Sequence, residues 1–499
     1  MSKVGLKSEL TLFDVTNLVV GAIIGADIYV ASQFGARNLG PFSLVVWVVA
    51  GVIAIVIALC FAQCAALLPK VGGPYAYAKE AWGPFAGFIV GWSLWLAEWV
   101  SLAVFPVAFV QYLGPLLSIW GFSLSLPLQT VVKGLFVAFL VATNIFGVKA
   151  AGKTNDVLTV VKLAPLVLFA IIGILFVVLH PVVAAGNFTP FLPGGLGSLG
   201  SFGITLVLVF WAYAGFEIST IPAGEIRDPG TTIPKAIVLG ITIVTIFYLV
   251  TNIVLFGVLP TSQLASTGTP LALATYTAAG VLISLPILAL ACQAIVGGGA
   301  LISVAGSDES GMIGTSRLGY ALAADGLFPG VFAKVHPRFK TPYLGIIIEG
   351  AAAFVAASAV STSGGLGMLI GVSVFFMTAS YLATSASIFF LRRKIKQAQF
   401  HLRGGAIIPI LGAGFSFYLI TQCTLTQIAL GLILLLVGVP IYIKYSPKKE
   451  IAELKEALLS REAILKRAHE GEQRFLAHAL QHVKHFYRRL AGKKQTPRD

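Results

Sequence analysis

The apolar residues of this chain occur in repeated runs of roughly twenty, and no other feature limits its fold as strongly. A helix of that length crosses about 30 Å of hydrocarbon at about 1.5 Å per residue. Lipid offers no partners to backbone N–H and C=O groups, so a crossing segment must satisfy them within a helix. Only 11% of the residues are charged, against about 25% in a soluble domain. The chain is therefore predicted to be an all-α polytopic membrane protein.

Twelve transmembrane helices fit these apolar runs. Their approximate bounds are residues 11–36, 40–68, 84–114, 129–148, 154–180, 200–222, 235–260, 284–307, 343–361, 366–391, 405–424 and 427–445. Basic residues gather in alternate loops, as Lys70 and Lys79 or Arg227 and Lys235 illustrate, whereas the loops between them carry almost none. The positive-inside rule then predicts that both termini are cytoplasmic. We expect the protein to lie in the cell (plasma) membrane.

The formal net charge of +14 does not indicate nucleic acid, because the basic residues gather in those loops and in the carboxyl-terminal tail. From Lys448 onward, thirteen Lys or Arg stand against seven Asp or Glu, with a helical apolar pattern. We interpret residues 446–499 as a basic cytoplasmic amphipathic tail that lies on anionic lipid, binds a protein, or is simply solvated. His478, His482 and His485 are interpreted as an exposed polar stripe, and neither a metal site nor a cofactor is predicted.

Glycines interrupt two of the predicted spans. Gly25 precedes Asp27 in the first span and Gly215 precedes Glu217 in the sixth, with the same two-residue spacing. Glycine is a poor helix former whose backbone can open and approach a ligand, so a helix break is predicted at each place. Paired broken helices in corresponding halves are typical of the substrate site of an inverted-repeat transporter. The alternative is that both glycines only let neighbouring helices pack closely.

Charged residues within the spans are the second indication of function, because a charge at a helix centre costs about 2.5 to 3.5 kcal/mol on insertion scales. The residues concerned are Asp27, Glu98, Lys162, Glu217, Asp308 and Glu309. Lys162 lies in the fifth span, where its amine either extends to the membrane interface or stays buried. A buried amine can bind and release a proton, or act as a fixed cation in place of a metal ion.

Several motifs together resemble the amino acid–polyamine–organocation superfamily of permeases. They are GAIIGADIY at residues 21–29, FWAYAGFE at 210–217, EIRDP at 225–229, IPKAI at 233–237 and SRLGYALAADGLFP at 316–329. The resemblance implies a leucine-transporter-like core of five plus five inverted helices, with helices 1 and 6 broken and two extra helices. The implied parts are a cytoplasmic amino terminus at 1–10, repeats at 11–180 and 200–391, helices 11 and 12 at 405–445, and the tail.

The resemblance also implies roles for individual residues. Backbone N–H groups at Gly25, Ala26 and Asp27 are expected to bind the substrate carboxylate. Carbonyl groups at Phe210, Trp211 and Tyr213, beside the break at Gly215, are expected to bind its amine, with Trp211 as an aromatic gate. The carbonyls of Gly21 and Ile24, with a hydroxyl of Ser303 or Ser307, correspond to a sodium site of sodium-coupled relatives. Lys162 is expected to put its ammonium in that site, which implies proton coupling or obligatory exchange.

Asp27 departs from the glycine that is usual at this position in the family, and a fixed negative charge there repels a carboxylate. Asp27 is expected to turn away, to pair with Lys162, to be protonated, or to bind an ammonium group. Asp308 and Glu309 also depart from neutral residues, which favours a cationic ligand or extra proton sites. The predicted function is secondary active transport of amino acids by alternating access. The alternatives are exchange of cationic amino acids or polyamines, and a transporter-like sensor.

Other function classes lack their usual signatures in the sequence. An integral membrane enzyme needs a compact nucleophile–base or metal constellation, and no HExxH or GK[ST] motif and no histidine within a central span is present. A channel needs repeated selectivity-filter segments or rings of charge, and none is visible. The expected partners are therefore a small amino acid or amine, a proton unless the protein is an exchanger, and the lipid bilayer.

Overall fold

The structure is a computed structural model that describes residues 10–70, 72–146, 151–221, 223, 226–360, 363–395 and 405–447. For residues 151–160 and 363–364 it describes the backbone alone. Residues 448–499 of the predicted tail, with its three histidines, and residues 1–9 of the predicted amino terminus lie outside the described residues. The described residues up to Tyr442 belong to one compact unit.

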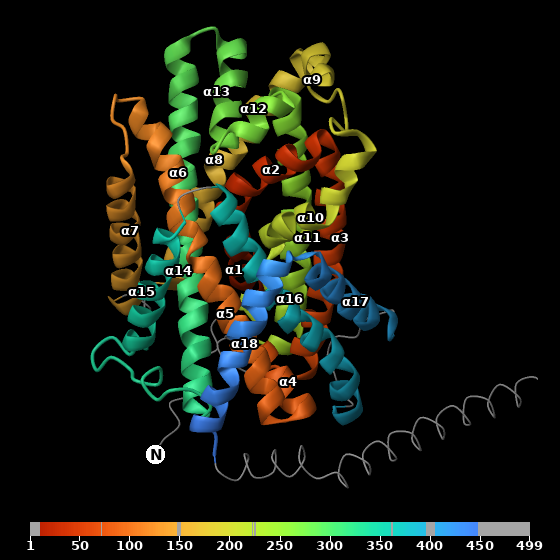
Figure 1. The fold of residues 1–499 in the computed structure, drawn as a ribbon, viewed down its shortest axis with the longest axis vertical. Coiled ribbons are helices and arrows are strands. Elements are labelled where there is room, and N and C mark those ends of the chain that lie inside the picture. The colour runs from red at the N-terminus through yellow and green to blue at the C-terminus, as the bar shows by residue number, and fades with distance from the viewer. Residues whose placement is uncertain are drawn as a thin grey trace, which may run out of the picture. The chain divides into compact units, whose positions relative to one another are not determined.

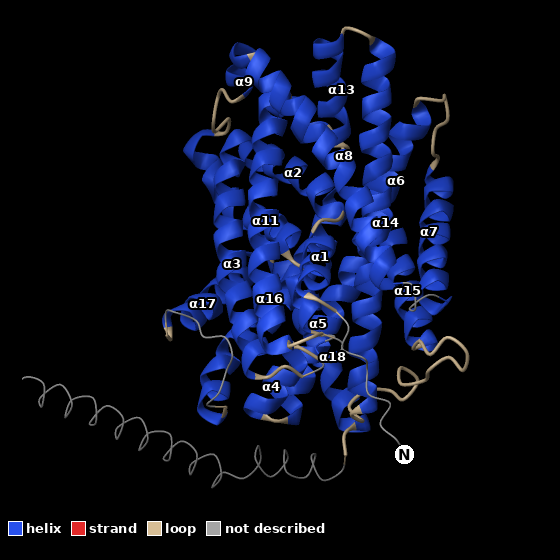
Figure 2. Cartoon of the chain, turned by 180° about the vertical axis from the view of Figure 1, so that it is seen from behind, coloured by secondary structure: helices blue, strands red, loops and turns tan. Residues whose placement is uncertain are grey.

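The described residues are helical, and their only β pairing is an isolated bridge between Leu10 and Ile226. Helix α1 lies in the middle of the bundle, with α5, α11, α14 and α16 around it (Figures 1 and 2). The helices are α1 (Leu12–Ile23), α2 (Ala26–Leu39), α3 (Ser43–Leu67), α4 (Pro74–Trp82), α5 (Pro84–Leu102), α6 (Val104–Ser118), α7 (Leu126–Phe146), α8 (Ala151–Leu179), α9 (Pro181–Asn187), α10 (Phe202–Phe210), α11 (Pro229–Val258), α12 (Thr261–Ser266), α13 (Pro270–Ile283), α14 (Pro286–Ala324), α15 (Tyr343–Ser358), α16 (Ser363–Lys394), α17 (Ile407–Gln422) and α18 (Leu425–Tyr445). Short 3-10 segments complete the chain: η1 (Gly40–Phe42), η3 (Gly195–Ser201), η4 (Trp211–Tyr213) and η5 (Phe216–Thr220).

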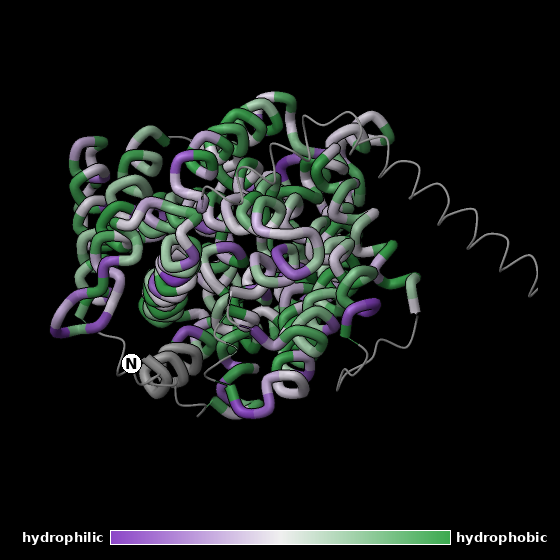
Figure 3. Tube along the Cα trace, turned by 90° about the horizontal axis from the view of Figure 1, so that it is seen from below, coloured by the Kyte–Doolittle hydropathy of each residue, from purple (hydrophilic) through white to green (hydrophobic). Residues whose placement is uncertain are grey.

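Nine helical stretches in the described residues are long and apolar enough to cross a membrane, which confirms a polytopic α-helical membrane protein. Four shorter apolar helices, α1, α13, α15 and α17, accompany them. Large apolar side chains such as Leu135, Ile246 and Val355 are more than half exposed on the helix surfaces, as lipid-facing residues must be. Less hydrophobic segments lie among the hydrophobic helices in the centre of the bundle (Figure 3). The count of twelve crossings and the inverted repeat stay predictions.

The structure corrects the predicted helix bounds in three places. The eighth predicted span does not end at residue 307, because α14 continues to Ala324. Its polar residues Ser307 and Asp308 resemble a loop by hydropathy, but both are buried among other helices and the helix passes through them. No helix is predicted in residues 261–283 or 69–83, where α12, α13 and α4 are found. Both α4 and α13 begin with a proline, Pro74 and Pro270. Proline is common at the first position of a helix, but neither helix start was predicted from it.

The predicted breaks are present in the first and sixth spans. Helix α1 begins at a capping box between Thr11 and Asp14 and ends before Gly25, where α2 starts in a new direction. The sixth span is α10 followed by η4 and η5, with an interruption at Gly215. A third interruption, at Ala103 between α5 and α6, is not predicted. Pro106 explains it, because a proline ring clashes with the carbonyl four residues earlier, here that of Leu102.

Candidate functional site

The break between α1 and α2 leaves backbone carbonyls at the end of α1 without helical partners, and two side chains bind them. Lys162 on α8 donates from Nζ to the Gly21 carbonyl at 2.5 Å and to Ser307 Oγ at 3.3 Å. Ser307 on α14 in turn donates from Oγ to the Ile24 carbonyl at 3.1 Å. Three helices that are distant in the sequence therefore meet at the carboxyl end of α1. This is the negative end of the helix dipole, where a cation is stabilised.

Lys162 is only 2% exposed, so its amine does not reach the membrane interface, and the prediction of a buried amine is the one that fits. The coupling role that the family resemblance implied for Lys162 stays a prediction. Asp27 and Lys162 do not form an ion pair in the structure, because no contact of 4 Å or less joins their charged atoms in the described residues. The ammonium group instead has two neutral oxygen atoms as partners.

The second break lies directly against the first. Gly215 has a φ of +119°, a conformation that L side chains rarely adopt, and its N–H donates to Glu217 Oε2 at 3.0 Å. A Cβ atom at Gly215 would lie 2.9 Å from the carbonyl carbon of Ala22, near the end of α1. Only glycine therefore permits both the backbone conformation and this close approach. The interruption of the sixth span is fitted to the end of α1.

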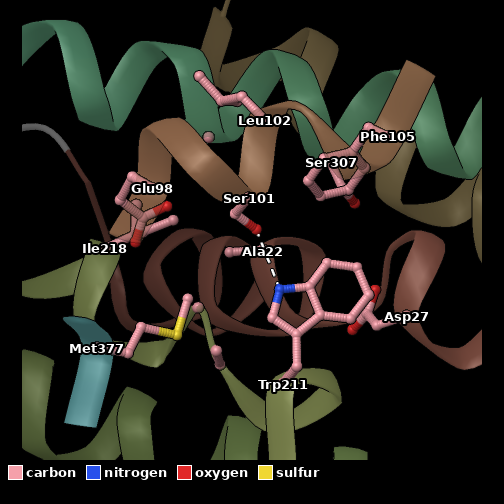
Figure 4. A pocket seen from close by; sticks show the side chains of 13 residues that line it. Ala22, Asp27, Glu98, Ser101, Leu102, Phe105, Trp211, Ile218, Ser307 and Met377 are labelled. Carbon is pink, nitrogen blue, oxygen red and sulfur yellow. Dashed lines mark hydrogen bonds between the residues drawn. The ribbon is translucent and has the colours of Figure 1, made fainter. Parts of the chain in front are cut away.

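A cavity lies between the two breaks and the helices that face them. It is lined by Ala22, Asp27, Glu98, Ser101, Leu102, Phe105, Trp211, Ala214, Gly215, Ile218, Ser307, Gly311 and Met377. The Trp211 indole lies across its middle and donates from Nε1 to Ser101 Oγ at 3.1 Å, as the dashed line in Figure 4 marks. The Phe105 ring packs against Trp211 with 6.1 Å between ring centroids. This places an aromatic surface where Trp211 is predicted to gate the site.

Asp27 lines the same cavity, on the far side of Trp211 from Glu98 (Figure 4). Its side chain is 5% exposed, and its Oδ2 atom lies 3.1 Å from the Tyr248 hydroxyl of α11. The Tyr248 hydroxyl also lies 3.0 Å from the Ile23 carbonyl. Asp27 is thus held at the first turn of α2, where an acidic side chain is favourable, and still faces the cavity.

The side chains of several other predicted site residues do not line the cavity. Tyr213 donates its hydroxyl to the Trp47 carbonyl at 3.0 Å and packs on Tyr248, away from the cavity. Phe210, Ala26, Ser303 and Asp308 are buried, and only Glu309 is half exposed. Ser303 Oγ has no hydrogen-bond partner among the described residues, so Ser307 rather than Ser303 supplies the hydroxyl near Lys162.

Several cavity residues come from helices that carried no local signal in the sequence. Ser101, Leu102 and Phe105 flank the unpredicted interruption of the third span, and Met377 comes from the middle of α16. Pro106 is the residue in the sequence that could have indicated this interruption, and with it the position of Ser101, Leu102 and Phe105. Glu98 was recognisable only as an acid within a span, and Tyr248 as a tyrosine in an apolar helix. None was predicted as a site residue.

The sequence as a whole matches a family model described as amino acid permease over residues 10–442. The chain belongs to this amino acid permease family. The resemblance to the amino acid–polyamine–organocation superfamily is thereby confirmed, and the chain is a multi-pass membrane protein of a transporter family.

Three curated relatives from Bacillus subtilis (strain 168) align along nearly the whole permease. A branched-chain amino acid permease, BcaP, is 29% identical over 89% of this chain and 94% of its own length. A methylthioribose transporter is 27% identical over 89% of this chain and 95% of its own length. A serine/threonine exchanger, SteT, is 25% identical over 90% of this chain and 98% of its own length. Because these proteins differ in substrate and in mode of transport, membership of the family does not identify either for this permease.

Proposed function

We propose that this permease is a secondary active transporter of amino acids that works by alternating access and is coupled to protons through Lys162. The observation that carries the proposal is the contact between the buried Lys162 ammonium and the Gly21 carbonyl at 2.5 Å. A cation at this point stabilises the carboxyl end of α1, and few other groups in the described core carry a positive charge. Amino acids as substrates are supported by the names of two of the relatives.

The proposed coupling follows from the charge of one amine. A protonated Lys162 binds the free carbonyl of Gly21 and keeps α1 against α8 and α14. Loss of the proton removes the charge that the helix dipole stabilises, so the end of α1 is held less strongly and can move. We assign this movement to the side on which the amino terminus lies, which the positive-inside rule predicts to be cytoplasmic. Proton release there would be followed by substrate release.

The substrate would lie between the two breaks, against Trp211. The free N–H groups at the start of α2 face its carboxylate, and carbonyl groups of η4 face its amine, because the ends of broken helices present these groups unpaired. Obligatory exchange remains the second candidate, since a permanently charged Lys162 would fix α1 without using a gradient. The relative named as a serine/threonine exchanger favours keeping this candidate.

Uptake into liposomes that contain the purified permease tests the proposal. Labelled branched-chain amino acids, serine and threonine are offered singly, with and without an inward proton gradient. Gradient-driven uptake that Lys162→Ala abolishes, in a variant that still folds although its melting temperature is lower, supports the proposal. Unaltered pH-dependent uptake by this variant refutes the role of Lys162. Uptake that requires internal amino acid and ignores the gradient establishes exchange, and no uptake of any amino acid reopens a sensor function.

Lys133 provides a matched control for the loss of a buried lysine. Its Nζ donates to the Ala357 and Val360 carbonyls, both at 2.8 Å, at the carboxyl end of α15 and far from the cavity lining. Lys133→Met should therefore lower the melting temperature, because two buried carbonyls lose their donor. The pH dependence of uptake should stay that of the wild type, which separates coupling from stability.

A further inference from the structure

Two buried carboxyl groups form one wall of the cavity. Glu98 on α5 is 8% exposed and lines the cavity directly (Figure 4). Glu217 on η5 lies behind it, fully buried, and the two side chains interact. One oxygen of Glu217, Oε2, accepts the Gly215 N–H at 3.0 Å. The other, Oε1, is buried, and the side chains of Glu98 and Tyr381 interact with this carboxyl group. Glu98 is therefore the member of the pair that a ligand in the cavity reaches.

The charge of the lining indicates which donor fits. No basic side chain is among the residues that line the cavity, whereas Asp27 and Glu98 both are. Two carboxyl groups that face each other in apolar surroundings cannot both carry a charge, because each repels the other. The pair is therefore expected to hold one proton in the empty cavity. A cation that reached Glu98 could replace that proton.

Few other ionisable groups approach this pair. Tyr381 of α16 lies beside Glu217, with its ring packed on Phe216 at 5.4 Å between centroids. From the cavity side, α6 contributes Phe105 and α14 contributes Ser307 and Gly311, none of which carries a charge. Asp27 is the remaining acid of the lining, at the other end of the cavity. A proton held by Glu98 and Glu217 thus has no nearby basic side chain to which it could pass within the described residues.

We propose that Glu98, supported by Glu217, binds an ammonium group on the side chain of the substrate in place of this proton. The substrate class is then amino acids with a cationic side chain, and the inference rests on the proposed transport of amino acids. The exchange is balanced, because one proton leaves the pair as one positive charge arrives. The Trp211 ring, which lines the same cavity, adds a surface on which an ammonium group is favourable.

Titration calorimetry of the purified permease tests this inference with L-lysine and L-norleucine, which differ by the side-chain ammonium. Measurements in two buffers with different heats of ionisation give the number of protons released on binding. Lysine should bind about tenfold more tightly than norleucine, as expected for a hydrogen bond to a charged group, and should release about one proton per ligand. Equal affinities without proton release would overturn the inference.

Substitutions then assign the effect to the pair. Glu98→Gln should remove the proton release and the tenfold preference for lysine over norleucine. Glu217→Gln serves as a second variant should the first fail to fold, and it should also remove the proton release. Glu349→Gln is the matched control, because Glu349 is buried on α15 and accepts Trp95 Nε1 of α5 at 2.9 Å, outside the cavity. Proton release that survives both Glu98→Gln and Glu217→Gln contradicts the assignment.

Cadaverine, which is lysine without its carboxylate, separates the two proposals. If cadaverine binds with proton release and no amino acid binds, the role of Glu98 stands and amino acid transport fails. If lysine and norleucine are both transported but bind alike and release no proton, amino acid transport stands and the role of Glu98 fails. Failure of all three compounds to bind refutes the inference about Glu98.

Discussion

Asp27 shows how one side chain can alter a site that the surrounding backbone otherwise defines. It lies in the first turn of α2, where free N–H groups are available to a substrate carboxylate. The Tyr248 hydroxyl, 3.1 Å from Oδ2, holds the carboxyl group against α11. Of the arrangements considered for Asp27 from the sequence, pairing with Lys162 is not observed. The carboxyl group is partly turned toward Tyr248 but still lines the cavity, where it can act on a ligand.

Replacing Asp27 should therefore change selectivity more than stability. Asp27→Gly removes the carboxylate from the site of the substrate carboxylate, and we expect the ratio of neutral to cationic amino acid binding to rise several-fold. Tyr248→Phe is the control, because it removes the hydrogen bond to Asp27 and leaves the charge in place. Competition against a labelled amino acid measures the ratio. An unchanged selectivity profile in Asp27→Gly would mean that this acid does not act on the ligand.

At the level of elements, the site depends on two helix breaks that fit each other. Gly215 adopts a positive φ and brings the sixth span against the backbone of Ala22. The same break places the Gly215 N–H on Glu217, next to Glu98. The end of α1 is bound on its other side by Lys162 and Ser307. A change in any of these contacts is therefore transmitted to the cavity by rigid helical segments.

Gly215→Ala tests how closely the breaks must fit. Alanine at this φ is strained by about 1 to 3 kcal/mol, and its Cβ would lie 2.9 Å from the Ala22 carbonyl carbon. We expect a melting temperature several degrees lower and a loss of uptake even in the folded fraction. Gly306→Ala is the control, since a Cβ atom there meets nothing within 4 Å. Alanine should slightly increase the stability of α14. Wild-type uptake by Gly215→Ala would show that the close contact is dispensable.

The sequence predicted what local chemistry determines and missed what tertiary packing determines. Glycines before Asp27 and Glu217 indicated both breaks, and a lysine within an apolar span indicated a buried amine. The continuation of α14 past Ser307 was missed because hydropathy cannot distinguish a polar residue in a loop from one buried between helices. The packing of the Tyr213 side chain on Trp47 was likewise not visible in the sequence, and the predicted role of the Tyr213 carbonyl stays a prediction. Glu98 was recognised as an acid within a span, but its place in the cavity, like that of Ser101, follows only from the fold.

In the bundle as a whole, one end is closed by α4, which joins two elements that lead to the cavity. The Gly72 N–H donates to the Ile221 carbonyl at 3.3 Å, just beyond η5. Lys79 of α4 forms an ion pair with Asp325 at 2.7 Å, at the end of α14, and Tyr75 also donates to Asp325. Access to the cavity from this end would require α4 to separate from η5 or from α14. These contacts therefore oppose opening.

The Asp325 contact should contribute to stability without adding to the pH dependence of transport. Partial burial raises the pKa of Asp325, but the hydrogen bonds from Lys79 and Tyr75 and the Lys79 charge outweigh burial and lower it below the ordinary value. For a lowered carboxyl pKa, the stabilisation is complete above the ordinary value of about 4 and is lost as the pH falls through the lowered one. Over the neutral range, Asp325 stays charged.

Asp325→Asn should accordingly lower the melting temperature by the same small amount at every pH from about 5 to 8, with the difference shrinking only below about pH 4. Both side chains of the ion pair are more than a third exposed, so the loss should be at most about 1 kcal/mol. Because the contact opposes opening, uptake should be unchanged or faster, and its pH profile should follow the wild type. A pH profile shifted by Asp325→Asn would mean that this end, and not Lys162 or the Glu98–Glu217 pair alone, senses the proton.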